Sequence, residues 1–241
     1  MAVVQDIGEA AINVREGTGD VDFLMSIHKL WRTVYSNELG WLNSADELQA
    51  DAYHDYSTYF LIEQTNEIGL PTPLATARVV SDSPCGLPIE RFMPLGPLKE
   101  GRKIIETQKL MVLPEYRSRR FQQAPLGLMA LIMQRVMRFA VTQNASMIIA
   151  DVFNDPQISP IGPLKQIGFQ KIGAPFVDTE LAAPIESVAM GISRSMFLNK
   201  LFTDDNLAML KYLRGEVTPR QVKRCDSPSP ARTTVNTSKA R

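Results

Sequence analysis

A strand, a basic loop and a long helix follow one another in the middle of the chain, and this unit constrains the fold most. Residues 104–114 (IIETQKLMVLP) are typical of a buried strand that Pro114 ends. After the basic residues of 115–123, apolar side chains recur at helical spacing over 125–143. Because the loop leads into a helix N-terminus, it offers backbone N–H groups where phosphate or thioester oxygens are stabilised. The unit therefore predicts an α/β fold with a binding turn at its centre.

The other elements follow from apolar periodicity and turn residues. We expect strands over 11–16, 58–64, 74–81, 146–153, 169–173 and 186–197, and helices over 21–35, 158–169 and 206–215. Asp20 or Asp22 is positioned to cap the first helix. The Pro- and Gly-rich residues 82–103 are expected to form an ordered loop with one short helix. We divide the chain into a main domain over 1–200, a helical extension over 201–224 and a flexible tail over 225–241.

Composition narrows the class of protein. Of the 241 residues, 44% are hydrophobic and 22% are charged, which is typical of a soluble globular protein. The net charge is zero, yet 99–138 holds nine basic and three acidic side chains, which favours an anionic ligand over general nucleic-acid binding. Two cysteines and two histidines indicate no disulfide framework and no metal site. With no signal peptide and no apolar run long enough for stable membrane insertion, we expect a cytoplasmic protein.

The order of elements resembles that of the Gcn5-related acetyltransferase (GNAT) fold, which implies a mixed, mostly antiparallel α/β sheet flanked by helices. Val112, Pro114 and Arg117 are similar to the "V-x-P-x-x-R" acyl-CoA-binding motif of that superfamily. The loop 117–124 lacks the glycines of the family pattern and carries Arg117, Arg119 and Arg120 instead. These arginines are interpreted as a dock for a phosphopantetheine phosphate or an acidic acyl carrier protein, or else as a solvated basic loop.

Further motifs resemble LuxI-type autoinducer synthases and, more closely, FeeM-type N-acyl amino acid synthases. They are RTVY at 32–35, LGW at 39–41, DAYHDYS at 51–57, LATARVV at 74–80 and IIETQKLMV at 104–112, within a resemblance that covers roughly 11–195. The chain departs from these patterns at His54, which stands where a second aspartate is expected, at Tyr59 and at Lys109. The resemblance implies a transferase that moves a fatty acyl group from acyl carrier protein, or from CoA, to the amine of an amino acid. It implies no tightly bound cofactor.

Three side chains are candidates for catalysis. Glu106 is a carboxylate in an apolar strand, so burial should raise its pKa toward that of a usable base, unless it forms a salt bridge with Arg78 or Lys109. Asp55 lies in the acidic loop, where a carboxylate can face an ammonium group, although a solvated loop is the alternative. Ser159 can steady a leaving thiolate or cap a helix.

The binding residues form two predicted groups. We expect the backbone N–H groups of Met111, Val112 and Leu113 to hold the thioester carbonyl. The expected acceptor pocket consists of Arg32, Trp41, Asp51, His54, Arg78 and Lys109. A charge in an apolar strand needs a partner, so Arg78 is expected to pair with the acidic loop.

Three other functions remain open at this point. An autoinducer synthase would use S-adenosylmethionine as the acceptor and form a lactone. An acetyl-CoA-dependent N-acetyltransferase is less favoured, since it predicts a glycine-rich loop. A non-catalytic acyl-binding module would keep the fold without the reaction.

Overall fold

A single seven-stranded sheet organises the computed structural model, which describes residues 11–42, 51–66 and 69–216. Its strands are β1 (Ile12–Gly17), β2 (Ser57–Thr65), β3 (Pro71–Ser81), β4 (Ile104–Val112), β5 (Met147–Phe153), β6 (Gln170–Lys171) and β7 (Ser187–Ser193). They lie in the order β1-β2-β3-β4-β5-β7-β6. The β4–β5 pair is parallel and the other neighbouring pairs are antiparallel. This confirms the predicted mixed, mostly antiparallel α/β sheet.

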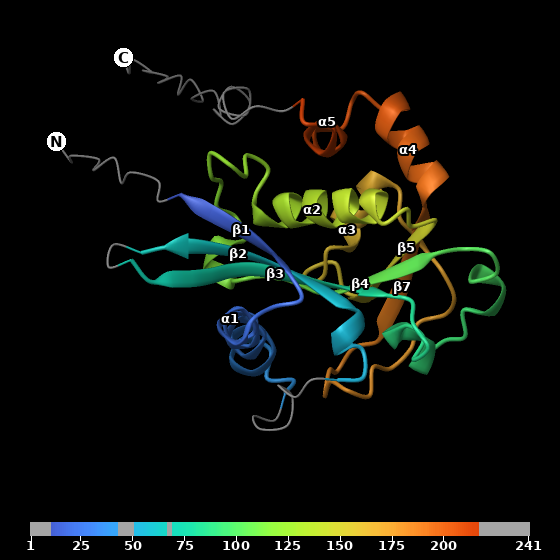
Figure 1. The fold of residues 1–241 in the computed structure, drawn as a ribbon, viewed down its shortest axis with the longest axis horizontal. Helices are drawn as coiled ribbons and strands as arrows, with labels where there is room; N and C mark the ends of the chain where they lie inside the picture. The colour runs from blue at the N-terminus through green and yellow to red at the C-terminus, as the bar shows by residue number, and fades with distance from the viewer. Residues whose placement is uncertain (1–10, 43–50, 67–68, 217–241) are drawn as a thin grey trace, which may run out of the picture.

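Helices cover both faces of the sheet (Figure 1). They are α1 (Val21–Trp31), α2 (Leu128–Thr142), α3 (Ile161–Ile167), α4 (Arg194–Thr203) and α5 (Ala208–Arg214), with shorter turns η1 (Arg32–Glu38), η2 (His54–Tyr56), η3 (Pro88–Arg91), η4 (Gly96–Leu98) and η5 (Pro114–Tyr116). The helix α1 packs on one face, and the other four helices share the large core on the opposite face. No helix in the described ranges combines the length and apolarity that crossing a bilayer requires.

The first helix changes from α-helical to π-helical winding at Arg32. Asp20 caps α1 as predicted, since its carboxylate accepts the N–H of Phe23 at 2.8 Å. From Arg32 on, the helix continues as the π-helical turn η1, in which Leu39 N–H donates to the Val34 carbonyl five residues earlier. Single π-helical turns are frequent at functional sites, and this one forms part of the cavity wall described below.

Several sequence-based boundaries are wrong, among them the start of α3 at Ile161 and not at residue 158, and two of them have a clear local cause. The central helix begins at Leu128 and not at Pro125, because Gly127 adopts φ +95°, a conformation that favours glycine, and places the turn there. The strand predicted over 186–197 ends at Ser193, whose hydroxyl accepts the Met196 N–H and starts α4.

The C-terminal helices join the main core. The chain runs without a break through residue 200 inside α4, and α5 packs on α2, α3 and α4. Phe197, Leu201, Leu210 and Leu213 are buried in the same cluster as the inner face of the sheet. The predicted extension over 201–224 is described as far as Glu216, and the tail over 225–241 lies outside the described residues.

An opening between β4 and β5 positions the site. The two strands pair from Ile104 opposite Met147 to Thr107 opposite Ala150, and the ladder stops there although both strands continue. Beyond this point β4 carries a bulge, with a shift in its pairing to β3 and φ +51° at Lys109. A bulge bends its strand, and the lost pairing leaves room between the ends of β4 and β5.

Candidate active site

A cavity of about 710 Å³ fills the opening between β4 and β5. On the α1 side of the sheet its wall includes Trp31 and Tyr35 from the first helix and its π-helical turn. Through the gap it reaches Met129 in α2 and Pro163 in α3. The cavity therefore passes from one face of the sheet to the N-terminal ends of two helices on the other face.

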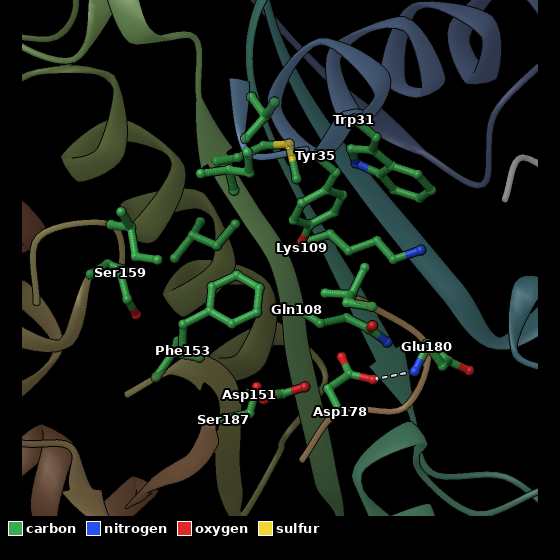
Figure 2. Close-up of a pocket in the computed structure, with 18 of the residues that line it drawn as sticks. Trp31, Tyr35, Gln108, Lys109, Asp151, Phe153, Ser159, Asp178, Glu180 and Ser187 are labelled. Carbon is green, nitrogen blue, oxygen red and sulfur yellow. Dashed lines mark hydrogen bonds between the residues drawn. The ribbon is translucent and has the colours of Figure 1, made fainter. Parts of the chain in front are cut away.

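Carboxylates gather at one end of this cavity, where Figure 2 shows Asp151, Asp178, Ser187 and Gln108 together. Burial, followed by the nearby charge of Asp178, raises the pKa of Asp151 to about 7. Its Oδ1 atom is buried and has no hydrogen-bond partner within the described part of the chain. Burial also raises the pKa of Asp178, whose carboxylate accepts the Glu180 N–H at 2.8 Å. This end of the cavity is suited to a cationic group that can give up a proton.

Lys109 lies between this cavity and a second, smaller one. Its ammonium sits 3.9 Å from the centre of the Trp31 ring. No ion pair or hydrogen bond of this ammonium is present among the residues that the structure describes. Burial, and then the charge of Arg78, lower the pKa of Lys109 to about 8. A half-buried cation without an ion-pair partner is costly, so the site is suited to an anionic ligand group at this position.

The second cavity, of about 270 Å³, is lined by an ion pair between the buried Arg78 and the partly exposed Asp51. Arg78 holds both carboxylate oxygens of Asp51 at 2.5 Å and donates through Nε to Ser57 Oγ at 2.8 Å. The expected pairing of Arg78 with the acidic loop is therefore present, through Asp51. Burial opposes ionisation of Asp51, but the hydrogen bonds and charge of Arg78 bring its pKa below the ordinary value. His54 lines the same cavity, with Nδ1 3.1 Å from the Tyr59 hydroxyl.

Glu106 is fully buried in the sheet and does not line the cavity. Its exposed fraction is 0%, its Oε2 accepts the Ile89 N–H at 2.9 Å, and it is not among the lining residues. Burial raises its pKa to about 8, in the direction expected from the sequence. The alternative salt bridge with Arg78 or Lys109 does not form.

The three arginines of the basic loop have different surroundings. Arg117 lines the cavity mouth, donates to both Glu38 oxygens at 2.6 and 2.7 Å, and donates to the Val112 carbonyl at 3.1 Å. Arg119 lies 4.6 Å from the Tyr116 ring centre, and Arg120 donates to the backbone carbonyls of Ser118 and Arg119 in its own loop. Arg119 and Arg120 are exposed and form no ion pair with any described residue. The loop therefore presents two uncompensated charges beside the cavity.

The expected carbonyl-binding N–H groups are only partly available. The Leu113 N–H donates to the Leu74 carbonyl at 2.9 Å, so its expected role is wrong. Successive N–H groups of a strand point to opposite sides, so the Val112 N–H points toward the opening where the β4–β5 ladder has stopped. Val112 and Met111 both line the cavity.

The remaining predicted residues are distributed unevenly. Ser159 lines the cavity with a buried hydroxyl that has no partner in the described ranges, and the helix-cap interpretation is wrong because Pro160 occupies that position. Arg32 lines the wall near the surface. Trp41 does not line the cavity, but its ring centre lies 4.6 Å from that of Phe153, which does. Asp55 is exposed and lines neither cavity.

Sequence reasoning missed Asp151, Asp178, Gln108 and Tyr35, all of which line the cavity. A signal for Asp151 was present, since a lone carboxylate in the apolar run MIIADVF carries the same meaning as Glu106 in its strand. No local pattern distinguishes Asp178, which follows β6 in an irregular segment. The described residues contain no group of three or more His, Cys, Asp or Glu side chains suited to a metal ion.

Comparisons with known proteins show which solved structures have a similar fold. No protein-family model and no curated protein sequence matches the chain. Among solved structures, the N-acyl amino acid synthase FeeM from uncultured soil microbes matches with a TM-score of 0.59 and 17% identity, over 80% of this chain and 100% of that one.

Two further structures match with lower TM-scores, over almost all of their own chains. The CoA-dependent acyl-homoserine lactone synthase BjaI matches with a TM-score of 0.51 and 15% identity, over 85% of this chain and 99% of its own. A mutant form of the spermidine/spermine N-acetyltransferase SpeG from Vibrio cholerae matches at 0.50 and 13%, over 78% and 97%. At these identities the likeness shows the fold alone. The chain has the α/β GNAT-like fold that these three structures share.

Proposed function

We propose that the chain is a cytoplasmic N-acyltransferase that moves an acyl group from a thioester to an amine. The observation that carries this proposal is the cavity through the β4–β5 gap, which joins an apolar side near two helix N-termini to an acidic end on the opposite face. A thioester and an amine entering from opposite faces meet at the gap. Bringing two reactants together in this way supplies a large part of the rate enhancement of such a reaction.

The donor side fits a long-chain thioester. Leu110, Met111, Met129 and Ile158 give the wall an apolar character suited to a fatty acyl chain. The Val112 N–H is available for the thioester carbonyl, and the unpartnered Ser159 hydroxyl for the leaving thiolate. Arg119 and Arg120 beside the cavity support docking of an acyl carrier protein or of CoA phosphates. A fatty acyl donor is favoured over acetyl-CoA by the size of the cavity.

Lys109 supports an amino acid as the acceptor. Its ammonium lacks a counter-ion in the described part of the chain and lines both cavities, while the carboxylates of Asp151 and Asp178 stand at the acidic end. An α-amino acid carries one group for each, a carboxylate for Lys109 and an ammonium for the acidic end. S-adenosylmethionine also carries a carboxylate and an ammonium group, so these contacts do not separate it from an ordinary amino acid as the acceptor. The product separates them, because the reaction with S-adenosylmethionine forms a lactone.

We expect cells that produce the chain to contain N-acyl amino acids that are absent from cells with an empty vector. The Ile158→Trp change narrows the cavity from its partly exposed rim and should reduce these products at least tenfold or shorten their chains. Val141→Trp places the same bulk on an exposed surface of α2 outside this cavity and should change nothing. Untargeted mass spectrometry of lipid extracts measures both. Lactone products would instead indicate the autoinducer reaction, and soluble protein without any new amide or lactone would contradict the proposal.

A second expected result concerns the acceptor. Lys109→Met should raise the KM for the amino acid about 10- to 100-fold, because a charge-assisted hydrogen bond to a carboxylate contributes about 1.5–3 kcal/mol. The KM for the matching decarboxylated amine should stay within about twofold of wild type. Equal effects on both acceptors would show that Lys109 does not bind the carboxylate.

A further inference from the structure

We propose that Asp151 is the catalytic residue that takes the proton from the acceptor's ammonium group. This inference rests on the proposed acyl transfer and names the residue that makes its nucleophile. The sequence directs attention to Glu106, but the structure favours its neighbour on β5.

The strand register decides which carboxylate meets the substrate. Glu106 pairs with Ile149, and the ladder ends one residue later at Thr107 opposite Ala150. Side chains on one face of a strand recur every second residue, so Asp151 follows Ile149 on the same face, just beyond the end of the ladder. Asp151 therefore lines the cavity, whereas Glu106 stays under η3 with its Oε2 bound to the Ile89 N–H.

Unpartnered polar atoms mark the place of a ligand. Asp151 and Gln108 both line the cavity, and their Oδ1 and Nε2 atoms are buried and have no hydrogen-bond partner among the described residues. Leaving such an atom unpaired costs about 1–3 kcal/mol each. One is an acceptor and the other a donor, so a ligand with an N–H beside an oxygen satisfies both. The acceptor's amine beside a carboxylate or carbonyl oxygen has this pattern.

The charged surroundings of Asp151 suit proton transfer near neutral pH. Glu106 from β4, Tyr35 from η1, Asp178 and Arg91 all interact with it or share its surroundings. Burial and the Asp178 charge raise its pKa to about 7, although Arg91 and the Ser187 hydroxyl act in the opposite direction. A base with this pKa is ionised above pH 7 and still holds a proton well enough to remove one from an ammonium.

The step balances without a further reactant. The ammonium gives one proton to the Asp151 carboxylate, and the free amine attacks the thioester carbon, so a C–N bond forms. The C–S bond then breaks, and the sulfur leaves with its electron pair. The second proton lost by the nitrogen goes to the thiolate, which yields an amide and a free thiol. Asp151 releases its proton to water and is ready for the next turnover.

The test compares pH–rate profiles of purified protein with the standard amino acids and with acetyl, octanoyl and palmitoyl thioesters of both CoA and acyl carrier protein, with the amide measured by mass spectrometry. Wild type should gain rate through about pH 7 and then level off. Asp151→Asn should lower kcat at pH 7 at least 100-fold, and its remaining rate should rise toward the pKa of the free amine. Asp151→Glu should restore part of the rise in rate that wild type shows near pH 7. Glu63→Gln, at a buried carboxylate of β2 outside both cavities, serves as the matched control.

Two results would overturn the assignment while leaving the acyl transfer intact. One is a soluble Asp151→Asn protein with the wild-type profile. The other is loss of the rise in rate near pH 7 in Glu106→Gln with that rise kept in Asp151→Asn, which would return the role to Glu106. Wild-type protein that forms no amide with any of these substrates would contradict the acyl transfer itself.

Discussion

Asp51→Ala is expected to lower the free energy of unfolding by about 3–5 kcal/mol, and more than Arg78→Met does. The two partners of this ion pair differ in burial, since the Arg78 side chain is 2% exposed and that of Asp51 is 41% exposed. Removing Asp51 leaves a guanidinium in the sheet interior without a counter-charge. Removing Arg78 leaves a carboxylate that water can solvate, and methionine fills part of the space with apolar atoms.

Urea unfolding at pH 7 measures both variants, and equal costs, or a larger cost for Arg78→Met, would contradict this account. The pH dependence provides a second check. Because the Arg78 pair lowers the pKa of Asp51, its contribution is present above the ordinary carboxyl pKa of 3.8 and is lost as the pH falls through the lower folded value. The Asp51→Ala curve should lack that acid-side loss, and a curve parallel to wild type below pH 4 would show that the pair does not contribute.

Local patterns predicted most of the sheet and failed at boundaries where an element with apolar residues follows closely on a strand or turn. The hairpin and the central strand–loop–helix unit carry periodicity and turn residues within short windows, so their order and type were predictable. The strand over 186–197 was predicted too long because Met196 and Phe197, apolar residues of α4, follow the last apolar residue of the strand after only three polar residues. Only the cap at Ser193, a single hydroxyl, separates the two elements. The turn at Gly127 was likewise concealed by the apolar helix that follows it.

The sequence indicated which kinds of side chains the site contains, but it did not indicate how they are arranged in space. The expectation that Arg78 needs a partner follows from the cost of burying a charge, and the structure supplies Asp51. Which of the two strand carboxylates, Glu106 or Asp151, reaches the cavity depends on where the β4–β5 ladder stops. No local sequence pattern encodes a loss of pairing between strands about 40 residues apart. The bulge at Lys109, a non-glycine residue at positive φ, was equally hidden. Backbone strain of this kind costs about 1–3 kcal/mol and persists where the surrounding structure fixes it.

Glu106→Gln is expected to remove a large part of the pH dependence of stability. Burial raises the pKa of Glu106 from an ordinary 4.5 to about 8, so the unfolded chain loses its proton long before the folded chain does. A carboxyl with this behaviour contributes most below its unfolded pKa, and that contribution falls by about 1.4 kcal/mol per pH unit until the folded pKa is reached. Glutamine has no such proton, and its side-chain oxygen can still accept the Ile89 N–H.

The two proteins should therefore diverge between pH 4.5 and 8, and the variant should be more stable by about 3–5 kcal/mol at the upper end, relative to their difference at the lower end. Asp151, whose pKa is also raised, contributes a slope of the same sign to both proteins, so the difference between the two curves reports Glu106 together with its interaction with Asp151. Chemical denaturation at a series of pH values gives the two curves. Parallel curves would mean that Glu106 ionises at its ordinary pKa and so has access to water. A cavity open to Glu106 would in turn remove the geometric argument for preferring Asp151 as the base.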